Sequence, residues 1–253
     1  IARHITPYGV GNSQLERGLE IDVTDFKSLL NGNVELKTYV ETWQAKGWVM
    51  SIEFDFLAGE PDFKYYQVTP VIQFNNNSLS GVPYGGEIRN GVITTPEEIE
   101  AKFDLKKSIS VGPNIKSMHF RTIISGWGHA TPNDNGGRGC AEWCFRTHKI
   151  KIDDSEKFSH YMGPIGCASN PINNQAGNWT PNRAGWCPGM VVPVRIDKFG
   201  SDMSNSTINF EYYFQPWINN FQYSGNNKNA YNAISTFVVL KSDQQIDAAT
   251  VSD

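Results

Sequence analysis

Apolar and polar residues alternate with a period of two along several stretches of the chain, which is the spacing of a half-buried β-strand. Residues 34–43 place aliphatic and threonine side chains on one face and put Glu41, between Tyr39 and Trp43, on the other. The same alternation recurs in residues 50–56, 120–124, 190–196, 208–214 and 234–240. Many short strands predict an all-β fold of the sandwich, jelly-roll or barrel type.

Two short segments carry helix signals instead. Thr24 stands before residues 25–30 and Gly32, which predicts a short helix capped by Thr24. Thr95 stands before a proline, with Glu98 at the third helical position, and this combination predicts a second short helix.

A domain boundary is expected at the Gly- and Pro-containing stretch 58–62, which divides the chain into residues 1–62 and residues 63–253. The sequence opens at Ile1 with neither an initiator methionine nor the apolar run of a signal peptide. We therefore expect the chain to be a processed or trimmed product of a longer polypeptide.

Composition supports strands joined by turns and excludes two classes of partner. Among 253 residues there are 23 Gly, 13 Pro, 14 Phe, 10 Tyr and 7 Trp, which is typical of aromatic strands separated by turns. The formal net charge is −4, so the chain lacks the basic surface that binding to a nucleic-acid backbone requires. No apolar run is long enough to span a bilayer, so we expect no membrane partner.

The four cysteines, Cys140, Cys144, Cys167 and Cys187, allow three disulfide connectivities. Disulfides are favoured because the Gly-, Pro- and Asn-rich loops around them suit cross-links in an oxidising compartment. A zinc site is the alternative, since Cys140, Cys144 and His148 follow one another at intervals of four. The five histidines form no His-x-His or His-His pair, so we expect no catalytic metal.

A carboxylate stands beside a tryptophan twice, as Glu41 with Trp43 and as Glu142 with Trp143. In carbohydrate sites an aromatic ring stacks on the apolar face of a sugar while a carboxyl group binds hydroxyls or moves a proton. The plainer interpretation is a core tryptophan beside a solvated glutamate. Glu142 is the stronger candidate, because two cysteines bracket it in a Gly-rich loop.

Neighbouring loops supply further candidates: Trp127, His129, Arg183 and Trp186. Loops that carry Trp, Arg and His on a rigid β scaffold commonly form binding sites. The alternatives are a surface role for His129 and a structural ion pair for Arg183. Glycosylation sequons begin at Asn76, Asn178 and Asn205, but so short a pattern is weak evidence of modification.

Seven segments together resemble the bacterial peptide:N-glycosidase F family, in the family's order and along nearly the whole chain. They include Ser-Gly-Trp-Gly-His-Ala at 125–130, Gly-Cys-Ala-Glu-Trp-Cys at 139–144 and Arg-Ala-Gly-Trp-Cys-Pro-Gly at 183–189. The others are residues 5–8, 17–30, 41–47 and 170–175.

The resemblance implies two eight-stranded antiparallel jelly rolls side by side, in a secreted or periplasmic bacterial amidase without a cofactor, and we expect the protein to be a monomer. Its substrates are N-glycosylated proteins or peptides, and it cleaves the amide between asparagine and the innermost N-acetylglucosamine, which turns asparagine into aspartate. By motif match, Glu142 is the essential carboxylate and Glu41 a second one. The family's substrate cleft maps onto Trp43, Trp127, His129, Arg183 and Trp186. Its local cysteine pairing implies the disulfides Cys140–Cys144 and Cys167–Cys187.

The chain also departs from the family. The principal catalytic aspartate of the family lies in a Cys-Asp-Glu-Trp-Asp-Arg stretch upstream of the position that matches Ile1. We therefore expect the first jelly roll to lack its opening strands here, which exposes core surface unless another segment covers it. Residues 95–103 read as an insertion.

Two rival functions remain at this point. One is a non-catalytic glycan-binding β-sandwich, the expected result if the aspartate-bearing segment is absent. The other is a glycoside hydrolase that uses Glu41 and Glu142 as its acid–base pair, with carboxyl groups about 5–5.5 or 6.5–9.5 Å apart.

Overall fold

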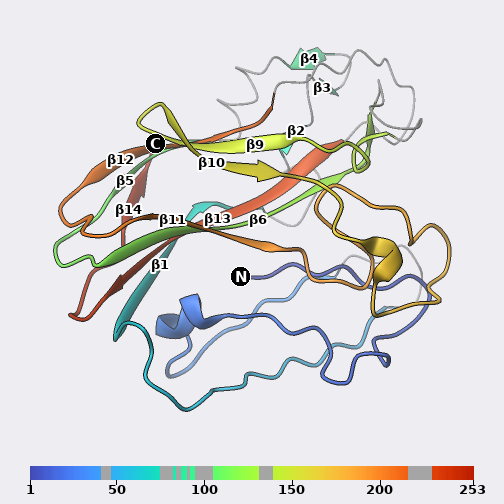
Figure 1. The fold of residues 1–253 in the computed structure, drawn as a ribbon, viewed down its shortest axis with the longest axis horizontal. Helices are drawn as coiled ribbons and strands as arrows, with labels where there is room; N and C mark the ends of the chain where they lie inside the picture. The colour runs from blue at the N-terminus through green and yellow to red at the C-terminus, as the bar shows by residue number, and fades with distance from the viewer. Residues whose placement is uncertain are drawn as a thin grey trace.

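The computed structural model describes residues 1–40, 47–74, 105–130, 139–215 and 230–253, together with short strands at 82–83, 87–89 and 92–94. Within these residues, two antiparallel five-stranded sheets form the body of the molecule (Figure 1). The first has the order β1 (Tyr65–Ile72), β13 (Tyr231–Ser242), β6 (Ser117–Trp127) and β11 (Val194–Gly200), and β2 (Val82–Pro83) also pairs with β13. The second has the order β10 (Ser155–Tyr161), β9 (Thr147–Ile152), β12 (Thr207–Tyr213), β5 (Lys106–Ser110) and β14 (Thr250–Ser252). The all-β prediction is confirmed.

Smaller elements connect to these sheets. Two-stranded ladders join β3 (Glu87–Arg89) to β4 (Val92–Thr94), and β7 (His129–Ala130) to β8 (Cys140–Ala141). The described residues include two 3₁₀ helices, η1 (Thr24–Leu29) and η3 (Cys167–Ser169). None of the helices in the described part of the chain is long and apolar enough to cross a membrane.

The core lies between the two five-stranded sheets. Alternate side chains of β6, β12 and β13 point into it and are almost fully buried, among them Phe120, Phe210 and Val238. The rings of Phe120 and Phe210, one from each sheet, have centroids 5.0 Å apart. The strands predicted at 120–124, 208–214 and 234–240 are therefore confirmed, because each has one face to bury against the opposite sheet.

The outer face of the first sheet is buried as well, because the N-terminal segment lies across it (Figure 1). Arg3 Nη1 donates to Ser125 Oγ at 3.0 Å and to the Ala233 carbonyl at 2.8 Å. His4 and Val191 form an isolated β-bridge. The N-terminal segment thus forms a second packed layer, which holds the neighbouring loops against the outer face of the first sheet.

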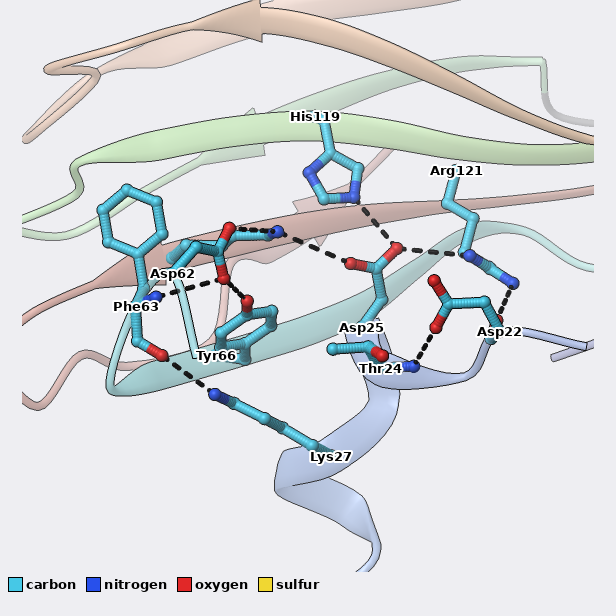
Figure 2. A network of polar contacts seen from close by, with 10 residues as sticks. Asp22, Thr24, Asp25, Lys27, Asp62, Phe63, Tyr66, His119 and Arg121 are labelled. Atoms are coloured by element: carbon cyan, nitrogen blue, oxygen red, sulfur yellow. Dashed lines mark hydrogen bonds and ion pairs between the residues drawn. The ribbon is translucent and has the colours of Figure 1, made fainter. Parts of the chain in front are cut away.

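A buried polar network fixes η1 to this outer face (Figure 2). Asp25 Oδ2 lies 3.0 Å from His119 Nε2 and 3.3 Å from Arg121 Nη1, and Lys241 Nζ is 3.9 Å from Oδ1. Burial alone would raise the pKa of Asp25, but the hydrogen bond from His119 and the charges of His119, Arg121 and Lys241 together lower it. Asp25 is thus held as a carboxylate.

The helix predicted after Thr24 is confirmed as the 3₁₀ helix η1, but the predicted cap is wrong. Val23 is the N-cap residue, and its side chain makes no capping hydrogen bond. Thr24 is the first helical residue, and its N–H donates to Asp22 Oδ1 at 2.8 Å. The helix predicted at Thr95–Glu98 and the insertion at 95–103 lie outside the described residues.

Two predicted strands are wrong. The structure assigns no strand within 34–40 or 47–57. A strand forms only where a neighbour accepts and donates its backbone hydrogen bonds, and no described segment pairs with these residues. Their large apolar side chains are exposed: Val34, Leu36, Tyr39, Trp48, Val49, Ile52, Phe54, Phe56 and Leu57.

A third strand begins later than predicted. β11 starts at Val194, directly after Pro193, which has no N–H to give to a ladder. Ile196 is exposed, and Phe199 packs against the core instead. The alternation in 190–196 therefore identified the strand but not its start, and of the predicted face Val192 and Val194 pack on the outer side of the sheet while Ile196 is exposed.

Candidate active site

Two disulfides lie in the loops beside β7 and β8. Cys140 is bonded to Cys144 and Cys167 to Cys187, as the family resemblance implies. The zinc alternative is wrong, because all four cysteine sulfurs are bonded in pairs. The first disulfide closes the turn that contains Glu142, and the second ties η3 to the loop after Arg183.

The backbone of Glu142 is held on both sides. β7 pairs with β8 so that His129 lies opposite Ala141, and the Glu142 N–H donates to the Gly128 carbonyl at 3.1 Å. The Ala184 N–H donates to the Glu142 carbonyl at 2.8 Å. These bonds, with the disulfide across the turn, fix the carboxylate before any substrate binds.

Arg183 fixes one oxygen of that carboxylate. Its Nε donates to Glu142 Oε1 at 2.9 Å. Its terminal nitrogens donate to backbone carbonyls: Asn178 at 2.5 Å, Pro181 at 2.9 Å and Trp179 at 3.4 Å. The Arg183 side chain is 2% exposed and that of Glu142 14%, so the carboxylate balances the charge of a buried guanidinium.

Aromatic rings surround the guanidinium of Arg183. Its central carbon lies 4.4 Å from the ring centroid of Trp143, 4.7 Å from that of Trp186 and 5.6 Å from that of Tyr8. Trp186 is 1% exposed and stacks against Trp127, with centroids 4.1 Å apart and planes 19° apart. Trp127 is partly exposed, and it therefore presents an aromatic surface supported from behind by Trp186.

The indole N–H groups of this stack are both satisfied by β6. Trp127 Nε1 donates to Ser125 Oγ at 2.8 Å, and Trp186 Nε1 donates to the Gly126 carbonyl at 2.7 Å. Each ring is consequently fixed in orientation as well as in position.

His129 lies at the open side of Glu142. Its side chain is 49% exposed, and its Nε2 is 3.1 Å from Glu142 Oε2. The hydrogen bond with Glu142 raises the pKa of His129, while burial and the charge of Arg183 act against that rise. Trp143 Nε1 donates to the same His129 Nε2 at 3.1 Å.

Five of the residues predicted from the sequence thus lie together: Trp127, His129, Glu142, Arg183 and Trp186. Glu41 and Trp43 fall in residues 41–46, outside the described residues. The described part of the chain contains no group of three or more His, Cys, Asp or Glu side chains placed to hold a metal ion.

Two residues of the site were not predicted as such. Trp143 was noticed only as the neighbour of Glu142, although it contacts both His129 and Arg183. Tyr8 belongs to the first segment that resembles the family, residues 5–8, and no other sequence feature pointed to a role in the site. Burial raises the pKa of Tyr8, the charge of Glu142 adds to that rise, and Arg183 opposes it, so Tyr8 belongs to the same electrostatic cluster.

Comparison with known proteins identifies the family of this chain. The family model described as "Peptide-N-glycosidase F, N terminal" matches residues 1–56, and that described as "Peptide-N-glycosidase F, C terminal" matches residues 96–239. This chain belongs to the peptide-N-glycosidase F family. The resemblance inferred from the sequence is thereby confirmed.

Relatives in the peptide-N-glycosidase F family match the whole chain. The peptide-N(4)-(N-acetyl-β-D-glucosaminyl)asparagine amidase F of Elizabethkingia miricola is 54% identical over 254 residues, which cover all of this chain and 67% of the relative. A solved structure of PNGase F, a glycosylasparaginase from Flavobacterium meningosepticum, matches with 51% identity and a TM-score of 0.85. A structure of recombinant PNGase F matches with 50% identity and a TM-score of 0.84. Each match covers all of this chain and 76% of the solved one.

Proposed function

We propose that this protein is a peptide-N-glycosidase, which hydrolyses the amide between an asparagine side chain and the innermost N-acetylglucosamine of an N-glycan. The products are aspartate on the peptide and a glycosylamine. The observation that carries the proposal is a carboxylate, Glu142, fixed by a buried Arg183 beside an aromatic surface, in a member of the peptide-N-glycosidase F family. No cofactor is required by this proposal.

The two oxygens of Glu142 have different tasks in this mechanism. Oε1 is occupied by Arg183, whereas Oε2 faces the half-exposed His129 and the open side of the site. Amide hydrolysis needs an oriented amide, a water nucleophile and proton delivery to a poor amine leaving group. Glu142 Oε2 binds the substrate amide or sugar and assists the proton transfer.

Other carboxylates complete the reaction in this proposal. Glu41 supplies the second carboxylate, which anchors the sugar core or raises the pKa of its neighbours by like-charge repulsion. Water activation is assigned to the aspartate that the family resemblance places upstream of the position of Ile1.

Substrate contact is assigned by exposure. Trp127 stacks on a sugar ring, and Trp43 extends that surface. His129, half exposed beside Glu142, contacts the bound glycan or peptide. Arg183 and Trp186 are 2% and 1% exposed, so they serve the substrate through Glu142 and Trp127, which they hold in place.

Residues 1–62 are proposed to be the remainder of a first jelly roll and residues 63–253 a second one. The two family models divide at 56 and 96, and β1 begins at Tyr65. The exposed apolar side chains of residues 34–57 support a further proposal, that additional polypeptide covers them and completes the first domain. Light scattering on the full-length protein tests the expected monomer, and a stable dimer would contradict it.

We assign the protein to an oxidising location, secreted or periplasmic. Two disulfides support this, because cytosolic proteins rarely keep them. Fractionation of the producing cells is the check, and cytosolic protein with free thiols would overturn the assignment.

The deciding experiment incubates the full-length protein with an N-glycopeptide and weighs the peptide product. Amidase action leaves aspartate in place of asparagine. Cleavage between sugars leaves N-acetylglucosamine on the peptide, which would identify a glycoside hydrolase. Retention of an unchanged glycopeptide on immobilised protein would favour the rival glycan-binding β-sandwich.

A further inference from the structure

One ring nitrogen of His129 has two neighbours that compete for it. Nε2 lies 3.1 Å from Trp143 Nε1 and 3.1 Å from Glu142 Oε2. An imidazole nitrogen holds either a proton or a lone pair in the plane of its ring, never both. The indole N–H of Trp143 can only donate, and an ionised Glu142 can only accept. Nε2 therefore cannot bond to both at once.

Two states follow from this competition. When Nε2 carries a proton, it donates to Glu142, and Trp143 finds no lone pair on that atom. When the neutral ring carries its proton on Nδ1, Nε2 has a lone pair and accepts from Trp143. Uptake of a proton from water at Nε2 converts this neutral imidazole into the imidazolium that donates to Glu142, so protons and charge balance.

We propose that Trp143 is a positioning residue, which competes with Glu142 for Nε2 of His129 and thereby influences whether Nε2 carries a proton or a lone pair. Its N–H stabilises every state in which the proton has left Nε2. The inference rests on the proposed function only in taking Glu142 as the catalytic carboxylate.

The local structure keeps the three groups in competition. Glu142 and Trp143 are consecutive residues in a turn, and the Cys140–Cys144 disulfide closes it. His129 reaches the same turn through the β7–β8 ladder. Sequence neighbours in a strand would point to opposite faces, whereas this turn aims both side chains at one ring.

Charges around His129 act in opposite directions. Glu142 favours the protonated ring, whereas Arg183 and burial disfavour it. The indole N–H of Trp143 disfavours the protonated ring, as Arg183 does. The guanidinium of Arg183 also lies over the Trp143 ring, 4.4 Å from its centroid. Trp143 thus counteracts the effect of Glu142 on the ring.

The wild-type protein provides the first test. The indole N–H resonance of Trp143 is followed by NMR over the pH range in which His129 titrates. We expect it to move with the same midpoint as His129, because Nε2 stops accepting from the indole when that nitrogen is protonated. The indole of Trp186, bonded to the Gly126 carbonyl, stays unchanged. A Trp143 resonance that ignores the titration of His129 overturns the proposal.

A pair of variants provides the second test. Trp143→Phe keeps an aromatic ring beside Arg183 but removes the N–H, so His129 should hold its proton to higher pH. Loss of one hydrogen bond predicts a rise of the His129 midpoint by about 0.5–1 pH unit. Trp127→Phe is the matched control, since that indole donates to Ser125 instead, and its His129 midpoint should match wild type. An unchanged or lower midpoint in Trp143→Phe contradicts the inference.

Neither measurement needs a substrate. A protein that shows the coupled titration but cleaves no glycopeptide refutes the proposed function alone. A protein that cleaves the glycopeptide but shows no coupling refutes the role of Trp143 alone.

Discussion

The Glu142–Arg183 pair is the residue-level feature on which the site depends. Arg183 gives its donors to one carboxylate and three backbone carbonyls, and almost none of its surface reaches water. A buried cation of this kind is tolerated only because each of its three nitrogens donates a hydrogen bond and the charge is balanced. Glu142 is therefore both a chemical group of the site and part of its support.

Glu142→Gln separates these two tasks. Glutamine still offers an oxygen to Arg183 but cannot exchange a proton, so glycopeptide cleavage should fall by about 10²–10⁴-fold. The steady-state rate of glycan release is the measurement. Glu211→Gln removes a carboxylate that pairs with Lys151 in the other sheet, and it should leave the rate unchanged. Near-normal cleavage by Glu142→Gln would remove Glu142 from the mechanism.

The sequence predicted which residues gather but not how they share their contacts. Motif position alone was enough to place Glu142, His129 and Arg183 in one site. Trp143 closely follows β8, whereas Arg183 and Trp186 belong to a later loop, so the contact between Arg183 and Trp143 forms only in the fold. No local sequence pattern encodes such a contact, because it is the packing of the sheets that positions each loop.

At the scale of elements, η1 docks onto the first sheet through charge rather than through apolar area alone. Phe26 packs edge-on against Phe237 at 5.3 Å, while Asp25 faces the cations of β6 and β13. Asp25 thus adds an electrostatic contact between the first part of the chain and the second.

Asp25→Asn should weaken this junction. The variant keeps the shape of the side chain but leaves the charge of Arg121 unbalanced, which we expect to lower the free energy of unfolding by about 3 kcal/mol at pH 7. The folded pKa of Asp25 lies below its ordinary value of 3.8, so its contribution is complete above that value and disappears as the pH falls through the folded pKa. Urea unfolding at several pH values checks both statements.

Asp202→Asn is the control for that experiment. Asp202 is an exposed acid in a turn, 3.7 Å from Lys116, so its replacement should change stability by less than about 1 kcal/mol. Equal stability of Asp25→Asn and wild type at pH 7 would show that the network does not stabilise the junction.

Strand prediction succeeded where a partner sheet exists and failed where none does. β12 and β13 followed their alternation because Phe210 and Val238 have an opposite sheet to contact. Residues 34–40 and 50–56 show the same alternation but pair with nothing in the described chain. Periodicity reports which face of a strand is apolar, and it carries no information about whether a neighbour is present to complete the ladder.

At the scale of the whole molecule, the sandwich encloses titratable groups as well as apolar ones. His160 bridges the sheets, with Nε2 2.7 Å from Asp197 Oδ2 and Nδ1 3.0 Å from Tyr212 Oη. His148 is buried nearby, and its Nδ1 accepts from the Gln215 N–H at 3.1 Å. Burial, with the charges of His160, Arg195 and Arg146, lowers the pKa of His148 to about 3.

His148 should make the sandwich sensitive to acid. The unfolded chain takes up a proton at this residue below its ordinary pKa of 6.5, whereas the folded chain does so only near 3, so stability declines as the pH falls between these values. From pH 7 to pH 5 the loss is about 2 kcal/mol. His148→Gln keeps an acceptor for Gln215 and should lose correspondingly less. Urea unfolding compares them, and equal losses would contradict the prediction.

Both disulfides lie in the loops of the candidate site, whereas the facing strands that form the core contain no cross-link. The Cys140–Cys144 loop is short, so replacing both residues with serine should cost only about 2 kcal/mol of stability. The same change at Cys167 and Cys187 should cost about 3 kcal/mol. Both variants should fold cooperatively yet release little glycan, as circular dichroism and the glycopeptide assay will show.

The position of these disulfides bears on how the protein can be used. Thiol reagents open disulfide-rich glycoproteins and expose their glycans, and here they act on the site once they gain access to cysteines that are at most 1% exposed. A reduced sample would keep its strand signal and its elution volume while its turnover declined. A folded sample of this protein can therefore be inactive, so its activity after exposure to reductant has to be measured by an assay of glycan release.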